Sequence, residues 1–205
     1  MDAQNEPIVE FWYEFASTYS YPAVMTINER AKSQQVHVHW RPFLLGPIFF
    51  ELGWTTSPFN LQPAKGQYMW RDLERTCAAL GLDFRRPDPF PQSSLLACRI
   101  ANVLEADTQR HSFSRRVFTA EFAEGEQIDD PDVLSTLLKE TGCDPEEVLT
   151  AALAPENKDA LKQTVNEAQS LGIFGAPMFV TPDRELFWGY DRMADALAWA
   201  RRSSD

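Results

Sequence analysis

Residues 7–42 constrain the fold of this chain more than any other segment. Aromatic and β-branched side chains crowd residues 7–15, which favours a strand with much of its surface buried. A short polar turn leads into a helical pattern over residues 22–31, and residues 36–42 alternate as a second strand. Strand, helix and strand within about 35 residues is the size of a βαβ unit, so we expect parallel strands joined by a right-handed crossover.

The rest of the chain changes character twice. Residues 43–63 are rich in Pro, Gly, Thr and aromatic side chains without periodicity, and we expect an ordered loop packed on a site. Residues 64–171 have the pattern of successive helices. Strand signals return at residues 178–181 and 185–189, on either side of a turn, which predicts a hairpin before a final helix. The order of elements therefore predicts an α/β domain interrupted by an all-helical insertion.

Charge and hydropathy limit the partners that the chain can have. A net charge of -11 argues against nucleic acids and anionic membranes, because both select clustered Lys and Arg. The longest apolar stretch, residues 43–50, contains Gly46 and Pro47 and is too short to span a bilayer. Residues 1–7 have neither the basic nor the apolar part of a signal peptide. We therefore expect a cytoplasmic protein with no membrane or nucleic-acid partner.

The cysteines do not form a redox or metal motif. Cys77, Cys98 and Cys143 are widely spaced, there is no CxxC, and the three histidines add no zinc-ligand spacing. We expect reduced, buried thiols. We also expect no metal, since the HxH pair of His37 and His39 is a weak metal signal and is better explained by a partly exposed strand face.

The polar turn between the first strand and its helix is the candidate reaction centre. Ser17 and Ser20 flank it, and two hydroxyls cannot form a disulfide. A serine without a nearby base is also a poor nucleophile. At a helix N-terminus, however, a hydroxyl can donate a hydrogen bond to an anion, beside unpaired N–H groups and the positive end of the helix dipole. The alternative is that Ser17 is simply a helix N-cap.

Four segments keep their order over most of the chain: residues 10–21 (EFWYEFASTYSY), 63–75 (PAKGQYMWRDLER), 172–180 (GIFGAPMFV) and 187–192 (FWGYDR). Together they resemble the 2-hydroxychromene-2-carboxylate isomerase family, a close relative of the kappa-class glutathione transferases. The resemblance implies an α/β, thioredoxin-like fold (βαβ…ββα) in its DsbA form. It also implies a discontinuous thioredoxin-like domain, with a helical insertion domain between its two parts. The expected boundaries are 1–45 and 166–205 for the first and 46–165 for the second.

The resemblance implies that glutathione is the cofactor. Ser17 would stabilise its thiolate, with Thr18 and Tyr19 beside it. Pro177 is expected to be a cis proline that faces the turn, so that Ala176 pairs with the cysteinyl backbone of glutathione. A trans proline at the start of a strand is the alternative.

Residues from two other segments are expected at the remaining parts of glutathione. Tyr190, Asp191 and Arg192 would meet the γ-glutamyl end, where the Asp191 carboxylate can pair with the α-ammonium group. Asp191 is also expected to be the N-cap of the final helix. Lys65 would pair with a carboxylate of glutathione or of the substrate, with a solvated lysine as the alternative.

Two positions depart from the family pattern. Relatives have Pro after the serine, where this chain has Thr18. The Asn with which relatives contact glutathione falls on Thr56, and Asn60 lies four residues on as a substitute. The candidate walls of an aromatic substrate pocket, each with core packing as its alternative, are Trp54, Phe59 and Trp188.

The resemblance thus implies a glutathione-dependent cis/trans isomerase that acts on a small conjugated aromatic carboxylate, and a homodimer. One alternative is a kappa-like glutathione transferase or peroxidase. Another is a non-catalytic thioredoxin-fold protein that binds peptides at the Pro177 groove.

Overall fold

The computed structural model of the chain describes residues 6–202. The prediction that there is no signal peptide concerns residues 1–7, most of which lie outside the described residues. The structure confirms the βαβ unit. Strand β1 (Ile8–Tyr13) leads through the polar turn into helix α1 (Ser20–Gln34), and β2 (His37–Pro42) then returns parallel to β1.

A C-terminal hairpin completes the sheet, as predicted. Strands β3 (Met178–Val180) and β4 (Leu186–Trp188) are antiparallel, and β3 also pairs antiparallel with β1. The strand order is β2-β1-β3-β4. Because β1 lies between β2 and β3, the polar turn starts from the interior of the sheet.

The predicted capping of the last helix is wrong. Helix α10 (Met193–Arg202) follows a 3-10 turn, η3 (Tyr190–Arg192), so Asp191 lies inside that turn and not at the start of α10. Gly189 precedes η3 with φ +104°, a value that suits glycine. The sequence pattern does not distinguish a 3-10 turn from the first turn of an α-helix.

The prediction of a loop over residues 43–63 is also wrong in part, because two short helices form there. Pro and Gly residues conceal the helical pattern in the sequence. Pro58, for example, lies in the first turn of α3, where the missing N–H group breaks no helical hydrogen bond. The helices between β2 and β3 are α2 (Leu45–Glu51), α3 (Pro58–Leu61), α4 (Pro63–Leu80), α5 (Leu95–Val103), α6 (Asp107–Thr119), the π-helix η2 (Ala120–Glu124), α7 (Pro131–Glu140), α8 (Pro145–Leu153) and α9 (Pro155–Ser170).

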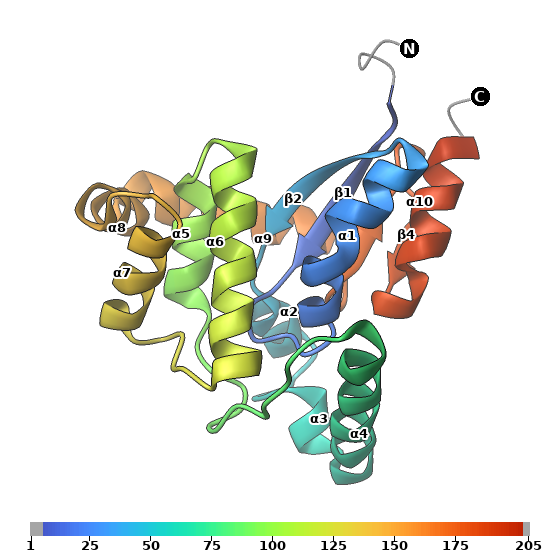
Figure 1. Cartoon of the computed structure of the whole chain (residues 1–205), viewed down its shortest axis with the longest axis horizontal. Coiled ribbons are helices and arrows are strands. Elements are labelled where there is room, and N and C mark those ends of the chain that lie inside the picture. The colour runs from blue at the N-terminus through green and yellow to red at the C-terminus, as the bar shows by residue number, and fades with distance from the viewer. Residues whose placement is uncertain (1–5, 203–205) are drawn as a thin grey trace.

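Each face of the sheet is covered by helices. Figure 1 shows α1 and α10 in front of the strands, α9 behind them, and α5 to α8 gathered beside them. Phe11 faces the first side, in a large core that continues into α5, α6 and α7. Trp12 faces the other, where it packs with residues of α2 and α9. The core therefore runs without a break from the sheet into the helical block, and the domain boundaries at 45 and 166 stay a prediction.

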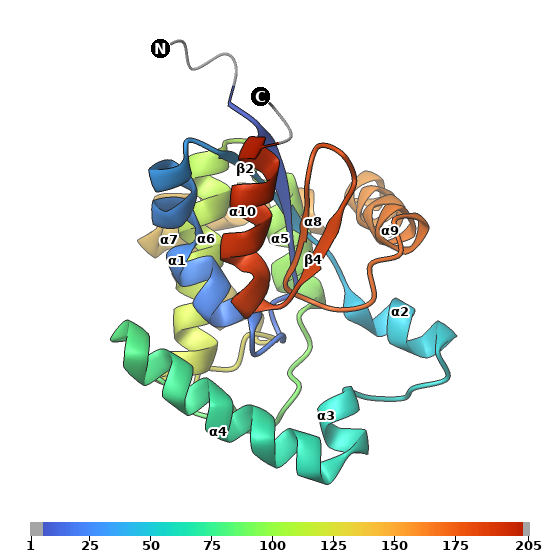
Figure 2. The ribbon, with the colours of Figure 1, turned by 90° about the vertical axis from the view of Figure 1, so that its right-hand side faces the viewer.

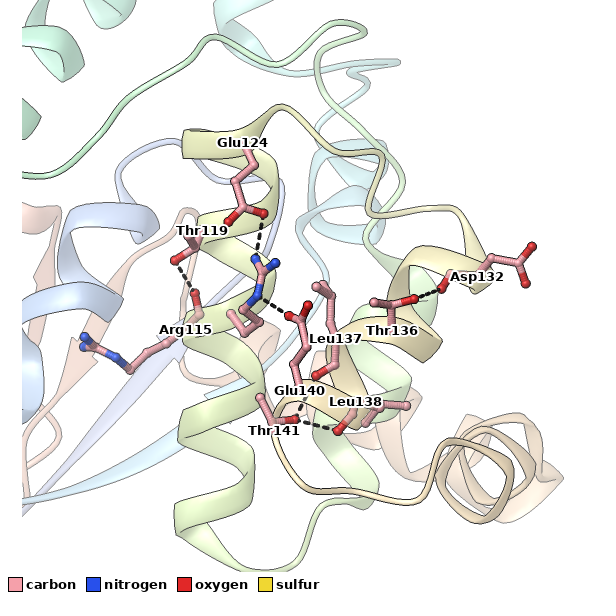
Figure 3. Close-up of polar contacts among 10 residues, drawn as sticks. Arg115, Thr119, Glu124, Asp132, Thr136, Leu137, Leu138, Glu140 and Thr141 are labelled. Carbon is pink, nitrogen blue, oxygen red and sulfur yellow. Dashed lines mark hydrogen bonds and ion pairs between the residues drawn. The ribbon is translucent and has the colours of Figure 1, made fainter.

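The helical block is also joined by ion pairs. The guanidinium of Arg116 donates to Glu124 Oε2 at 2.8 Å and to Glu140 Oε2 at 2.6 Å, which ties the end of η2 to the end of α7 (Figure 3). In residues 6–202 no helix is long and apolar enough to cross a membrane.

Candidate functional site

The turn after β1 holds Ser17 against the segment before β3. The Ser17 N–H donates to Glu14 O at 3.0 Å, and its hydroxyl donates to Ala176 O at 2.9 Å. Helix α1 begins at Ser20, with Tyr19 at the N-cap position. Ser17 is therefore not a helix cap, and its hydroxyl instead joins two segments that are 159 residues apart.

The peptide bond between Ala176 and Pro177 is cis, as the family resemblance implied. The Pro177 carbonyl accepts a hydrogen bond from the Gly189 N–H at 2.9 Å, which places the start of η3 beside the cis proline. The residues on either side of this peptide bond thus face the Ser17 turn and the C-terminal hairpin.

The turn can receive an anion. The N–H groups of Thr18 and Tyr19 have no hydrogen-bond partner among the described residues, and they lie at the N-terminal end of α1. Unpaired N–H groups and the positive end of a helix dipole both favour negative charge. With the Ser17 hydroxyl they supply three donors in consecutive residues. Ser20 contributes none, because its buried Oγ lies inside the core.

Two side chains of the turn contact α4. The Thr18 hydroxyl donates to Met69 Sδ at 3.1 Å, and the Tyr19 hydroxyl donates to Asp72 Oδ2 at 3.0 Å. Arg75 pairs with the other oxygen of Asp72 at 3.0 Å. Asp72 therefore makes an ion pair along α4 and also fixes Tyr19, a contact that the helical spacing alone does not reveal.

Several acidic groups act on Tyr19. Burial raises the pKa of its hydroxyl, and so do the hydrogen bond to Asp72 and the charges of Asp72 and Asp191. Tyr19 therefore stays protonated and acts as a hydrogen-bond donor. The effect of Asp191 also shows that its carboxylate lies within electrostatic reach of the turn, although it comes from η3.

We call residues 45–80, which comprise α2, α3 and α4, the arm; Figure 2 shows α3 and α4 beneath the N-terminal end of α1. The arm carries Thr56, Asn60 and Lys65. The Asn60 amide donates to Thr56 Oγ1 and to Phe90 O, each at 3.2 Å, so the proposed substitute and the residue it replaces contact each other. Lys65 is exposed in the first turn of α4 and has no ion pair within residues 6–202.

The three residues of η3 that were predicted to contact glutathione have different surroundings. The Tyr190 hydroxyl accepts a hydrogen bond from Arg30 Nη2 at 2.7 Å, and the same guanidinium lies over its ring, so this side chain is held on α1. Asp191 and Arg192 are exposed and 3.8 Å apart, and Arg192 also pairs with Asp195 at 3.0 Å. Of these three residues, Asp191 therefore has the polar group that is most available to a ligand.

The three predicted pocket walls are not brought together as one cluster. The ring of Phe59 lies 6.4 Å from that of Tyr19, at the turn. Trp188 packs edge-on against Phe174 at 5.0 Å, close to the cis proline. Trp54 instead packs against Phe49 of α2.

One acidic residue inside the turn, Glu14, was not among the predicted site residues. Glu14 is buried, and burial raises its pKa to about 7, partly offset by hydrogen bonds from Ser94 and from the Ala16 N–H. A signal was present: a glutamate between aromatic residues at the end of a buried strand has no exposed face to occupy.

No metal site accompanies these residues. Across residues 6–202, no group of three His, Cys, Asp or Glu side chains could hold a metal ion. Cys77, Cys98 and Cys143 are free and buried, as predicted, and Cys98 and Cys77 have pKa values raised by burial. None of these thiols lies in the turn.

Comparisons with known proteins agree with this geometry. Human glutathione S-transferase kappa 1 is 26% identical over 198 residues, which cover 90% of this chain and 87% of the relative. The 2-hydroxychromene-2-carboxylate isomerase of Sphingobium xenophagum is 25% identical over 190 residues, which cover 90% of this chain and 93% of the relative.

A solved structure of a 2-hydroxychromene-2-carboxylate isomerase superposes with a TM-score of 0.86 at 20% identity, covering 96% of this chain and 95% of the other. At that identity the likeness concerns the fold. The DSBA-like thioredoxin domain family matches residues 8–198, nearly the whole described chain. The protein therefore belongs to the DSBA-like thioredoxin domain family, with isomerases and kappa-class glutathione transferases among its relatives.

Proposed function

We propose that the chain is a glutathione-dependent isomerase of the 2-hydroxychromene-2-carboxylate type. The observation that carries this proposal is the Ser17 hydroxyl, 2.9 Å from the carbonyl that precedes a cis proline and next to the unpaired N–H groups of Thr18 and Tyr19. Three donors without a base suit the binding of an anion. They do not suit attack by the serine itself.

The residues present fit glutathione as the anion's source. The free thiol of a cysteine has a pKa of about 8.5, and donors at a helix N-terminus lower such a pKa. Ala176, before the cis proline, offers a backbone carbonyl to a peptide-like ligand. Lys65 and Asp191 are exposed charges that can pair with its carboxylates and its ammonium group.

In this proposal bound glutathione supplies a thiolate that adds reversibly to a conjugated carbon, which turns a double bond into a rotatable single bond. Ser17 and the two N–H groups hold the charge at the turn. Tyr19, kept protonated, donates its hydroxyl to Asp72 next to this charge. Phe59 and Trp188 would border the aromatic substrate. Trp54 is a weaker candidate for the pocket wall, because it packs against Phe49 of α2.

The Ser17–Ala176 hydrogen bond has a consequence for binding. The hydroxyl that would hold the thiolate and the carbonyl that would pair with the ligand backbone satisfy each other here. A ligand must replace this bond with bonds of its own. We therefore expect binding to need both ends of the cysteinyl unit, the sulfur and the main chain.

Three measurements test the proposal. Titration calorimetry with glutathione separates an enzyme of this type from a non-catalytic peptide-binding protein, which would show no binding. Turnover of a hydroxychromene carboxylate, compared with turnover of an aryl halide, separates the isomerase from a kappa-like transferase, which the similarity to human glutathione S-transferase kappa 1 makes the second candidate. In a crystal with glutathione, a sulfur out of hydrogen-bonding reach of Ser17 Oγ would refute the mechanism.

The remaining expectations belong to the same proposal. We infer a cytoplasmic homodimer that acts on a small molecule. Free, buried cysteines support a reducing compartment. Sedimentation analysis of the purified protein tests the dimer directly.

A further inference from the structure

Two buried glutamates, one in the turn and one in the π-helix η2, have no role in the proposed reaction. Glu14 follows β1 and is 6% exposed, and Glu121 lies in the π-helix η2 and is 0% exposed. The core around them is aromatic: Phe15, next to Glu14, and Phe122, next to Glu121, both stack on Phe118. An acidic side chain is rarely buried without a partner, so the pair needs an explanation.

Glu14 fixes the shape of the turn. Its carboxylate accepts hydrogen bonds from the Ser94 hydroxyl and from the Ala16 N–H, and its main-chain carbonyl accepts the Ser17 N–H at 3.0 Å. One residue thus holds the two positions that come before the anion-binding N–H groups. Any change in its charge acts directly on the segment that carries Ser17.

Glu121 is the unusual member of the pair. Both of its carboxylate oxygens are buried without a hydrogen-bond partner in residues 6–202. It lies in a π-helical turn, a feature that is frequent at functional sites. The turn is well anchored, because Arg116 ties Glu124 at its end to α7 (Figure 3). A charged carboxylate in this position would be very costly, so Glu121 is held as a neutral acid.

The groups that face the pair are acidic or neutral. Burial and the charges of Glu14 and Asp129 raise the pKa of Glu121 well above its ordinary value. From α5, Cys98 donates its thiol to Phe43 O at 3.3 Å, and burial together with the charge of Glu14 raises its pKa. Among residues 6–202 no basic side chain acts on either carboxyl group, so a proton balances their charge.

We propose that Glu14 and Glu121 form a buried acid pair that stores a proton at the Ser17 turn. Glu14 is a positioning residue in this pair, and its carboxylate is protonated when the ligand bound at Ser17 becomes negatively charged. The proposal rests on the thiol ligand of the proposed function. When the ligand's S–H bond breaks, its proton leaves to solvent, and the Glu14 carboxylate takes up one proton from solvent. Two negative charges on the same turn are thereby avoided.

The first test needs no ligand. Because burial raises the folded-state pKa of Glu14 from 4.5 to about 7, this residue contributes stability below pH 4.5 that is lost as the pH rises towards about 7. Glu14→Gln keeps the size of the side chain and one acceptor oxygen, and it removes the titration. Its melting temperature relative to wild type should rise steadily between these pH values. The exposed control Glu126→Gln should show no such trend, and a flat difference for Glu14→Gln overturns the proposal.

The second test counts protons. Calorimetry in two buffers of different ionisation enthalpy gives the protons released when glutathione binds at pH 7. Glu14→Gln should release about half a proton more than wild type, because it cannot take one up. S-methylglutathione, which has no thiol, should show no difference. Equal release by both proteins with glutathione overturns the proposal.

A third measurement does without Glu14→Gln, in case that variant does not fold. Infrared spectra at neutral pH should show the carbonyl band of a buried protonated carboxyl group. That band should grow with glutathione and not with S-methylglutathione, and Glu121→Gln should weaken its ligand-independent part. If glutathione does not bind at all, the proposed function fails, while the stability test and the band of the unliganded protein still decide on the acid pair.

Discussion

The turn that carries Ser17 is mostly buried, whereas the arm that carries Lys65 is mostly exposed. The turn is joined to the segment before β3 by Ser17 and to the sheet by β1. The arm is joined to the turn by Thr18 and Tyr19, which reach Met69 and Asp72 on α4. The proposed site thus has a rigid thiol end and a carboxylate end on a more weakly attached element.

This difference predicts where specificity and chemistry lie. A preorganised donor set acts on the charge that forms during reaction, and this is usually a large catalytic effect. An exposed lysine contributes little binding energy, because its charge is screened by water and salt. We therefore expect substitutions in the turn to lower turnover and substitutions in the arm to lower affinity.

The largest effect should come from Ser17→Ala. Removing one donor from a developing anion typically costs about 10²- to 10³-fold in turnover. It should also raise the pKa of the bound thiol, so that thiolate absorbance appears at a higher pH. Ser20→Ala is the matched control, since the Ser20 hydroxyl is buried without a partner among the described residues. Equal losses for the two variants would contradict the role of Ser17.

A smaller effect is expected at the junction of α3 and α4. A Cβ on Gly66 would lie 2.4 Å from the main-chain oxygen of Phe59, so Gly66→Ala must push α3 away. Overpacking of this kind costs about 1–3 kcal/mol. Gly46→Ala in α2 meets nothing within 4 Å and should stabilise its helix by about 0.5–1 kcal/mol. Denaturant unfolding compares the two, and an equal sign for both would show that the arm is not packed as described.

The contrast between turn and arm also explains what the sequence could predict. The strands and the parallel crossover follow from local rules such as alternation, and they are confirmed. The caps that Asp130 and Asp144 form at the starts of α7 and α8 obey a local rule as well. The family resemblance supplied the cis proline. The two short helices of the arm escaped prediction because Pro and Gly break the periodicity on which helix assignment depends.

Pairings between distant segments were beyond sequence reasoning. Ser17 and Ala176 each stood out, but their hydrogen bond depends on how β1 and β3 are aligned. Glu121 gave no signal at all, because a glutamate near the end of an amphipathic helix is normally exposed. It is buried here because the helix changes to a π-helix at Ala120, a local geometry that cannot be predicted from the sequence pattern.

The hydrogen bond between turn and arm can be tested by itself. Tyr19→Phe should lower the free energy of unfolding by about 1 kcal/mol, since it leaves Asp72 Oδ2 without this donor. Tyr68→Phe is the control, because its exposed side chain makes no hydrogen bond within residues 6–202. A double-mutant cycle of Tyr19→Phe with Asp72→Asn isolates the pair. Additive losses would mean that the turn and the arm are not coupled through it.

The smallest effect is expected for Lys65→Met, which probes the arm alone. An exposed ion pair is worth about 0.2–1 kcal/mol, so glutathione affinity should fall at most about fivefold and turnover should not change. The loss should shrink as salt is raised, because exposed charges are screened. Lys162→Met on α9 serves as the control for a general charge effect. A salt-insensitive loss of more than tenfold would mean that Lys65 is desolvated in the complex. In that case the arm closes on the ligand. The carboxylate end of the site then becomes as ordered in the complex as the thiol end is without a ligand.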